Sequence, residues 1–166
     1  MTVPPRVLVT RAAADLLDTL QKQHGPVMFH QSGGCCDGSS PMCYPVGDFV
    51  VGDRDILLGL LDAGSDGVPV WISGPQFDAW RHTQLVIDLV PGRGGGFSLE
   101  APEGVRFLSR GRAFTDEEND QLEAVPALTG SQYEAGATPP GPRGEVVAEA
   151  ADACPVPRGR AAQVPG

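Results

Sequence analysis

The chain has 166 residues and a net charge of −9 at pH 7, which restricts its partners. An acidic surface repels phosphate backbones and anionic lipid headgroups, so we expect neither nucleic acid nor a membrane as a partner. The length predicts one domain with a sizeable core. The N-terminal region lacks the apolar run of a signal peptide, and no run reaches the roughly 18 apolar residues of a membrane span, so we expect a cytoplasmic location.

The first predicted elements are a strand, a helix and a second strand, in that order. Residues 7–9 form the first strand, and Thr10 is placed to cap a helix. The helix has apolar residues at three- and four-residue spacing, namely Ala13, Leu16, Leu17 and Leu20. Gly25 followed by Pro26 ends the helix, and residues 27–30 form a strand that leads into a cysteine-rich loop.

Short strands separated by turn residues follow this loop. We expect them at residues 49–51, 55–61, 68–72, 83–90, 97–99 and 105–108, although ILLGLL at residues 56–61 taken alone fits a strand or a helix. A turn at residues 65–67 joins two of them as a hairpin. A short helical segment at residues 75–81 carries Phe77 and Trp80 on one face, and we expect these two residues and Trp71 to belong to the core.

The glycine-rich segment PGRGGG, residues 91–96, interrupts the strand pattern. It lacks the lysine and the following helix of a phosphate-binding P-loop, so we interpret it as a turn or bulge between strands. Such a turn can bring backbone close to the cysteine loop.

The end of the chain divides into a short helix and a tail. Thr115 and Glu118 fit a capping box, and the acidic run at residues 116–120 is then a solvated helix start favoured by the helix dipole. Residues 129–166 are rich in proline, glycine and alanine without apolar periodicity, so we expect a disordered tail after a single domain at residues 5–128. The domain is predicted to be α+β, with an N-terminal helix, a mostly antiparallel β-rich core and a short C-terminal helix.

The segment FHQSGGCCDGSSPMC, residues 29–43, holds three of the four cysteines and one of the three histidines. Its glycines and serines allow tight turns, so thiols a few residues apart can converge. Thiolates are the ligands that zinc, copper(I) and iron–sulfur clusters favour. We therefore predict a site for a transition metal ion or an iron–sulfur cluster. The candidate ligands are the three thiols and three side chains that could complete the set: Cys35, Cys36, Cys43, His30, Asp37 and His82.

Three other interpretations of these cysteines stay open. They can be buried and inert, because free cysteine is among the most buried residue types. They can form a disulfide, although a reducing cytoplasm counts against it. One of them can act as a redox or nucleophilic thiol if a cation such as protonated His30 or His82, or Arg93, lowers its pKa. The spacing contains no Cys-x-x-Cys pair, and the ligand interpretation is the one we favour.

The cysteine segment is one of three motifs that occur in order, followed by QFDAWRHTQLVIDLV at residues 76–90 and PGRGGGFSLEAPEGVRFL at residues 91–108. Together they resemble the bacterial family known as domain of unknown function 779, and the resemblance extends over about residues 7–122. The family has no established activity. Its members are often encoded beside an NAD-dependent aldehyde dehydrogenase, which implies that dehydrogenase as a partner and an accessory role in alcohol or aldehyde oxidation.

The Gly-Gly-Cys sequence at residues 33–35 and the segment at residues 87–102, with its Ile-Asp, Gly-Phe and proline, are similar to those of HesB-like A-type iron–sulfur carriers. This second resemblance implies a HesB-like fold and, because such carriers often pair, a homodimer with a shared site. The carriers complete their cluster site with a Cys-Gly-Cys sequence, which is missing from residues 104–114 here. Cys36 and Cys43 would have to replace it.

The cysteine loop therefore predicts a non-enzymatic protein that binds a metal ion or iron–sulfur cluster, and the family resemblance implies that it does so in support of an aldehyde dehydrogenase. A thiol-based redox or aldehyde-handling enzyme is the first alternative. A scaffold or regulator of the dehydrogenase that binds no metal is the second. The three hypotheses differ in metal content, in thiol reactivity and in whether binding to the dehydrogenase needs the cysteines.

Overall fold

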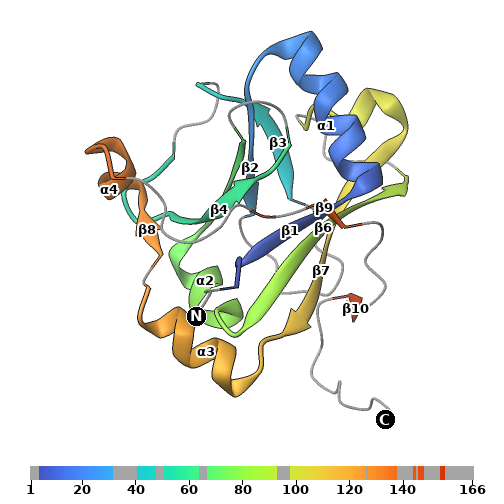
Figure 1. Cartoon of the computed structure of the whole chain (residues 1–166). Helices are drawn as coiled ribbons and strands as arrows, with labels where there is room; N and C mark the ends of the chain where they lie inside the picture. Colours follow the sequence, from blue (N-terminus) through green and yellow to red (C-terminus); the bar gives the residue numbers. More distant parts are fainter. Residues whose placement is uncertain are drawn as a thin grey trace.

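Two sheets and the helix α1 enclose one hydrophobic core in the computed structural model of the chain (Figure 1). The structure describes residues 4–31, 41–47, 51–63, 67–92, 98–125, 127–137, 144, 146–147 and 154–155, the last pair for the backbone alone. Its elements are β1 (Val7–Thr10), α1 (Arg11–His24), β2 (Val27–Gln31), β3 (Met42–Pro45), β4 (Ile56–Leu61), β5 (Val68–Ile72), α2 (Gly74–Trp80), β6 (Thr83–Pro91), the 3₁₀ helix η1 (Ala101–Glu103), β7 (Val105–Ala113), α3 (Asp116–Glu123), β8 (Leu128–Thr129), α4 (Gly130–Glu134), β9 (Val146–Val147) and β10 (Cys154–Pro155).

The two sheets are mixed. In sheet A the order is β10-β7-β6-β1-β9, and β1 runs parallel to both β6 and β9. In sheet B the order is β3-β2-β5-β4-β8, and β2 runs parallel to β5. The remaining pairs are antiparallel, including the long β6–β7 hairpin. The predicted α+β class is confirmed, and the parallel pairs arise because β1 and β2 each pair with a strand much later in the chain.

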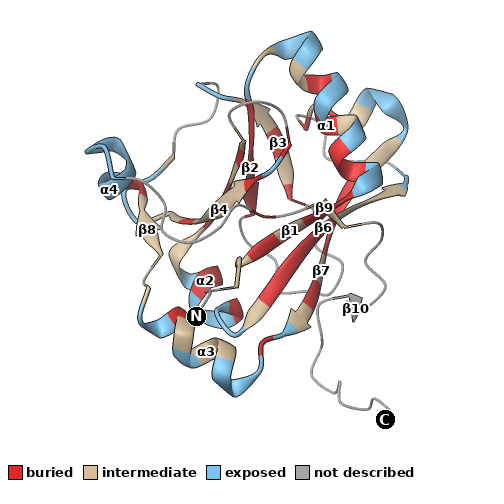
Figure 2. Cartoon of the chain, viewed as in Figure 1, coloured by how far each residue is buried: buried red, intermediate tan, exposed pale blue. Residues whose placement is uncertain are grey.

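Helix α1 begins and ends as its sequence predicts. The Thr10 side chain accepts a hydrogen bond from the backbone N–H of Ala13 at 3.3 Å, and Gly25 ends the helix at φ 83° with its N–H bonded to the Gln21 carbonyl. Leu17 and Leu20 are buried, while the opposite side of the helix is exposed (Figure 2). In the described part of the chain, every helix is too short or too polar to cross a membrane.

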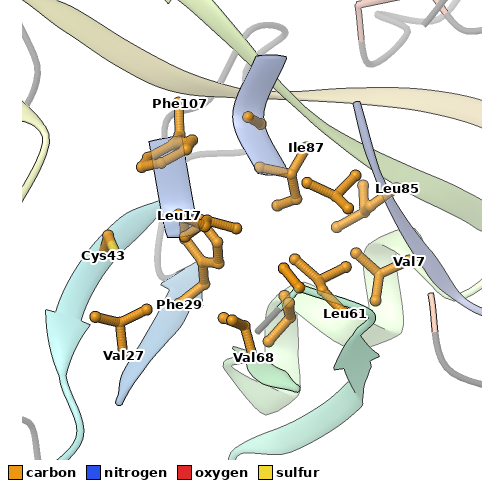
Figure 3. Close-up of a cluster of buried hydrophobic side chains, with 14 of the residues drawn as sticks. Val7, Leu17, Val27, Phe29, Cys43, Leu61, Val68, Leu85, Ile87 and Phe107 are labelled. Atoms are coloured by element: carbon orange, nitrogen blue, oxygen red, sulfur yellow. The ribbon is translucent and has the colours of Figure 1, made fainter. Parts of the chain in front are cut away.

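The core lies between the two sheets and under α1, with side chains converging from both sheets (Figure 3). The Phe29 and Phe107 rings meet edge to face, with centroids 4.8 Å apart. Strands β1 and β4 approach closely at Gly59, where an added Cβ would lie 3.5 Å from Val7 Cγ1. The expectation that the two tryptophans and Phe77 are buried is confirmed, because each is at most 9 % exposed. Phe77 and Trp80 pack in this core, whereas Trp71 belongs to a smaller buried cluster with Met28 and Leu57.

The strand expected at residues 97–99 is wrong for Ser98 and Leu99, which lie in a turn before η1. The cause is the buried carboxylate of Glu100, which accepts hydrogen bonds from the Ser98 hydroxyl and from the Phe107 backbone N–H. The chain therefore turns around this carboxylate instead of extending. The expected strand at residues 49–51 and the expected turn at residues 65–67 fall largely outside the described residues.

Part of the C-terminal segment is placed against both sheets. Gly144 donates its N–H to the Leu60 carbonyl and accepts from the Asp62 N–H, both at 2.8 Å, and Val146 pairs with Val9 of β1. An added Cβ at Gly144 would lie 2.2 Å from the Val7 carbonyl oxygen, so only glycine fits there. The sequence gives no sign of these contacts, because two-residue strands have no periodicity. The domain limit at residue 128 stays a prediction.

Candidate functional site

The cysteine-rich connection joins two neighbouring strands of sheet B. β2 and β3 pair antiparallel, with Phe29 opposite Cys43 and His30 opposite Met42. Residues 32–40, which include Cys35, Cys36 and Asp37, lie outside the described residues. The two described ends of this connection are adjacent in the sheet, because His30 pairs with Met42.

The two strands direct their candidate ligands to opposite faces of sheet B. Cys43 shares the core face with Phe29, where Figure 3 shows its sulfur beside the Phe29 ring and Val27. His30 is one residue further along β2 and therefore points to the outer face. The thiol of Cys43 and the imidazole of His30 do not converge on one point.

Cys43 lies in a buried polar network. Its backbone N–H donates to Ser98 Oγ at 2.8 Å, and its carbonyl accepts from the Leu99 N–H at 3.0 Å. Ser98 in turn donates to Glu100. Burial raises the pKa of the Cys43 thiol far above its usual range, and the negative charge of Glu100 raises it further. The thiol is therefore protonated at neutral pH, which makes it a poor metal ligand and a poor nucleophile.

His30 forms an oriented pair with a carboxylate on the outer face. Its Nε2 lies 3.0 Å from Asp55 Oδ2, and the His30 side chain is 5 % exposed. The same oxygen accepts the backbone N–H of Gly52 at 2.9 Å, so a turn fixes the carboxylate. A neutral imidazole that donates Nε2–H to this oxygen keeps its lone pair on Nδ1.

Helix α4 supports this turn from outside. The Gly130 N–H donates to the Asp55 carbonyl at 2.8 Å, and an added Cβ at Gly130 would lie 2.1 Å from the Gly52 carbonyl oxygen. Our prediction from sequence placed α4 in the tail and missed this contact. Thr129 and Gln132 form a capping box, and this pattern is the signal that could have identified the helix.

His82 belongs to a different group of residues. Its Nδ1 lies 3.1 Å from Asn119 Oδ1, and it lines a cavity with Arg6 and Phe77. The described residues contain no group of three or more His, Cys, Asp or Glu side chains that could hold a metal ion.

An apolar cavity of about 480 Å³ lies on the outer face of sheet B. Met28 and Trp71 form part of its wall, and the Trp71 ring meets Tyr133 edge to face at 5.5 Å. Val46 and Tyr133, also in the wall, are exposed large apolar residues. The sequence did not predict this cavity, because Tyr133 falls in the predicted tail.

A family model described as "Domain of unknown function (DUF779)" matches residues 16–113. The chain belongs to the DUF779 family. In this DUF779 chain, the matched residues include both the His30–Asp55 pair and the buried network around Cys43, whereas α4 lies beyond them. No curated protein and no solved structure matches the chain. The HesB-like fold therefore stays a prediction.

Proposed function

We propose that this DUF779 chain is a non-enzymatic protein that binds a transition metal ion through Cys35 and Cys36 together with His30. The observation that supports the proposal is the His30–Asp55 pair at the sheet end from which the cysteine connection leaves. Metal-ligating histidines usually donate their second ring nitrogen to a carboxylate, which fixes the tautomer and makes the ring a better ligand.

The residues differ in how well they suit a metal. One imidazole and two thiols from the connection match the ligand types of zinc sites, and Asp37 can supply a fourth donor. Cys43 is left out of the proposed ligand set because its thiol is protonated and lies on the core face. An iron–sulfur cluster would use the same two thiols.

The proposed partner is an aldehyde dehydrogenase, and the support for this part is the family resemblance alone. Co-purification of the dehydrogenase with the chain tests it. Binding that survives replacement of both Cys35 and Cys36 would favour a scaffold or regulator over a metal-dependent accessory protein. A failure to bind the dehydrogenase leaves the metal proposal to be judged by metal content.

Anaerobic purification of the untagged protein, followed by elemental analysis and an absorption spectrum, tests the metal proposal. We expect a stoichiometric metal ion, or iron with sulfide, in the wild type and a lower content in Cys35→Ser, Cys36→Ser and Asp55→Asn. Cys43→Ala is the control, and we expect it to keep its metal. Folded protein that takes up no zinc, copper or iron would overturn the proposal, and one fast-alkylating cysteine at pH 7 would then favour a thiol enzyme.

A further inference from the structure

A second cavity, of about 380 Å³, lies between α2, α3 and the residues before β1. Its wall combines apolar and cationic side chains. The residues that line it are Arg6, Ile56, Phe77, Arg81, His82, Leu122, Glu123 and Ala127. In Figure 1, α2 and α3 lie together near the N-terminus of the chain, away from α1. We call this cavity the two-arginine pocket.

Arg6 is held in this pocket by groups that do not neutralise it. Its Nη2 donates to the carbonyls of Leu122 at 3.3 Å and Val125 at 3.5 Å, at the end of α3. Its guanidinium carbon lies 5.3 Å from the centroid of the Phe77 ring. Burial lowers the pKa of Arg6, and the positive charge of Arg81 lowers it further. The guanidinium still carries its charge at neutral pH.

Arg81 places a second cation at the same ring. Its guanidinium carbon lies 5.4 Å from the Phe77 centroid. Within the described part of the chain, no carboxylate oxygen lies within 4.0 Å of the guanidinium of either Arg6 or Arg81. Arg6 is part-buried and donates to carbonyls at the end of α3, whereas Arg81 is exposed to solvent beside the Phe77 ring.

The pocket is cationic in an acidic chain. The lining of the pocket contains two arginines and one acidic residue, Glu123, so its net charge is +1 when His82 is counted as neutral. The whole chain, counted in the same way, carries −9. Two like charges at one ring repel each other, and an anion near both would relieve this repulsion. The apolar part of the wall, which includes Phe77 and Ile56, is unsuited to a bare hydrated ion.

We propose that the two-arginine pocket binds a small monocarboxylate with a short apolar tail. The planar fork of a guanidinium matches a carboxylate, and two such forks can share its two oxygens. The tail would lie against Phe77 and its apolar neighbours. Glu123 disfavours anions of higher charge, which selects a monocarboxylate over a phosphate dianion. The site is independent of the metal site proposed for the cysteine connection.

Titration of the full chain with butyrate, followed by amide and imidazole NMR shifts, tests this proposal. We expect saturable shifts at residues 77–82, 122–125 and 127. Arg81→Gln should weaken butyrate binding about tenfold, and Arg11→Gln, which removes the same charge from the exposed start of α1, should leave it unchanged. Butanol supplies the tail without the charge, and inorganic phosphate supplies the charge without the tail; both should bind more weakly than butyrate.

Several outcomes would overturn the proposal. Butyrate shifts outside the pocket, or equal affinity in wild type and Arg81→Gln, would remove the pocket as the site. Equal weakening by Arg11→Gln would show a non-specific charge effect. Phosphate binding tighter than butyrate would replace the monocarboxylate with a phosphate ligand and contradict the role given to Glu123. A thermal unfolding curve for Arg81→Gln that matches the wild type shows that the variant is folded, which makes these comparisons valid.

Discussion

The two faces of sheet B differ in chemistry, although they share the same strands. On the core face, Cys43 is buried beside Phe29, and its thiol is kept protonated. On the outer face, His30 is fixed by Asp55 beneath a turn and α4. Membership of a cysteine-rich segment therefore does not make a residue a ligand. The two-residue period of a strand decides which side chains can reach a common site.

The largest expected effect comes from Glu100→Ala on the core side. The substitution leaves the Ser98 hydroxyl and the Phe107 N–H as buried donors without their acceptor, and it opens a cavity. We expect unfolding free energy to fall by about 3 kcal/mol in urea denaturation. Glu103→Ala, on an exposed residue of η1, is the control and should change little. Equal stability of the two variants would contradict the role given to the Glu100 carboxylate.

The protonation of Cys43 predicts a dependence of stability on alkaline pH. Folding raises the pKa of this thiol, so its contribution is fully present below the pKa of an unfolded cysteine and is lost above it. We expect unfolding free energy to fall by about 1.4 kcal/mol per pH unit above about pH 8.5. Urea denaturation of wild type and Cys43→Ala at rising pH measures the difference. Parallel pH profiles for the two proteins would mean that Cys43 ionises equally in both states.

Asp55→Asn tests the outer face. The amide cannot hold His30 as the carboxylate does, so we expect metal affinity to fall about tenfold or more. Competition titration with a chromophoric chelator measures this affinity. Asp53→Asn, on an exposed residue of the same turn, is the matched control. If both variants bind metal as the wild type does, the His30–Asp55 pair is structural.

The smallest effect is expected for Tyr133→Ala at the apolar cavity. It removes the edge-to-face contact with Trp71, but Tyr133 is 38 % exposed, so the loss should be about 1 kcal/mol in urea denaturation. Tyr133→Phe keeps the ring and should match the wild type. A loss as large as that of Glu100→Ala would show that the outer face contributes as much stability as the core face.

Local signals predicted much of the fold. Thr10 and Gly25 mark the ends of α1, and the capping box at Thr115 marks the start of α3. These features depend on residues close together in sequence, which is why the sequence reveals them.

The candidate site was only partly predictable, because its decisive contacts are long-range. The register between β2 and β3 decides whether Cys43 points to the core face or the outer face. The glycines and serines between the two strands do not determine this register. Asp55 reaches His30 because β2 and β4 both pair with β5, which brings the start of β4 near His30. A glutamate is usually expected on the surface, so the sequence does not indicate that Glu100 is buried. Only the folded chain shows that its carboxylate accepts hydrogen bonds from Ser98 and Phe107.

The contacts of Gly144 and Val146 have a consequence for the solubility of shortened chains. Gly144 hydrogen-bonds to the backbone at the end of β4, and Val146 pairs with Val9 of β1. Among the described strands, no other one pairs with these backbone groups of β1 and β4 on the same side. A chain ending at residue 137 would leave those groups open to strands of another molecule, which is a common route to aggregation. We therefore expect Gly144 and Val146 to protect these positions from pairing with a neighbour, and a substitution at Gly144 to have the same effect as removing the segment.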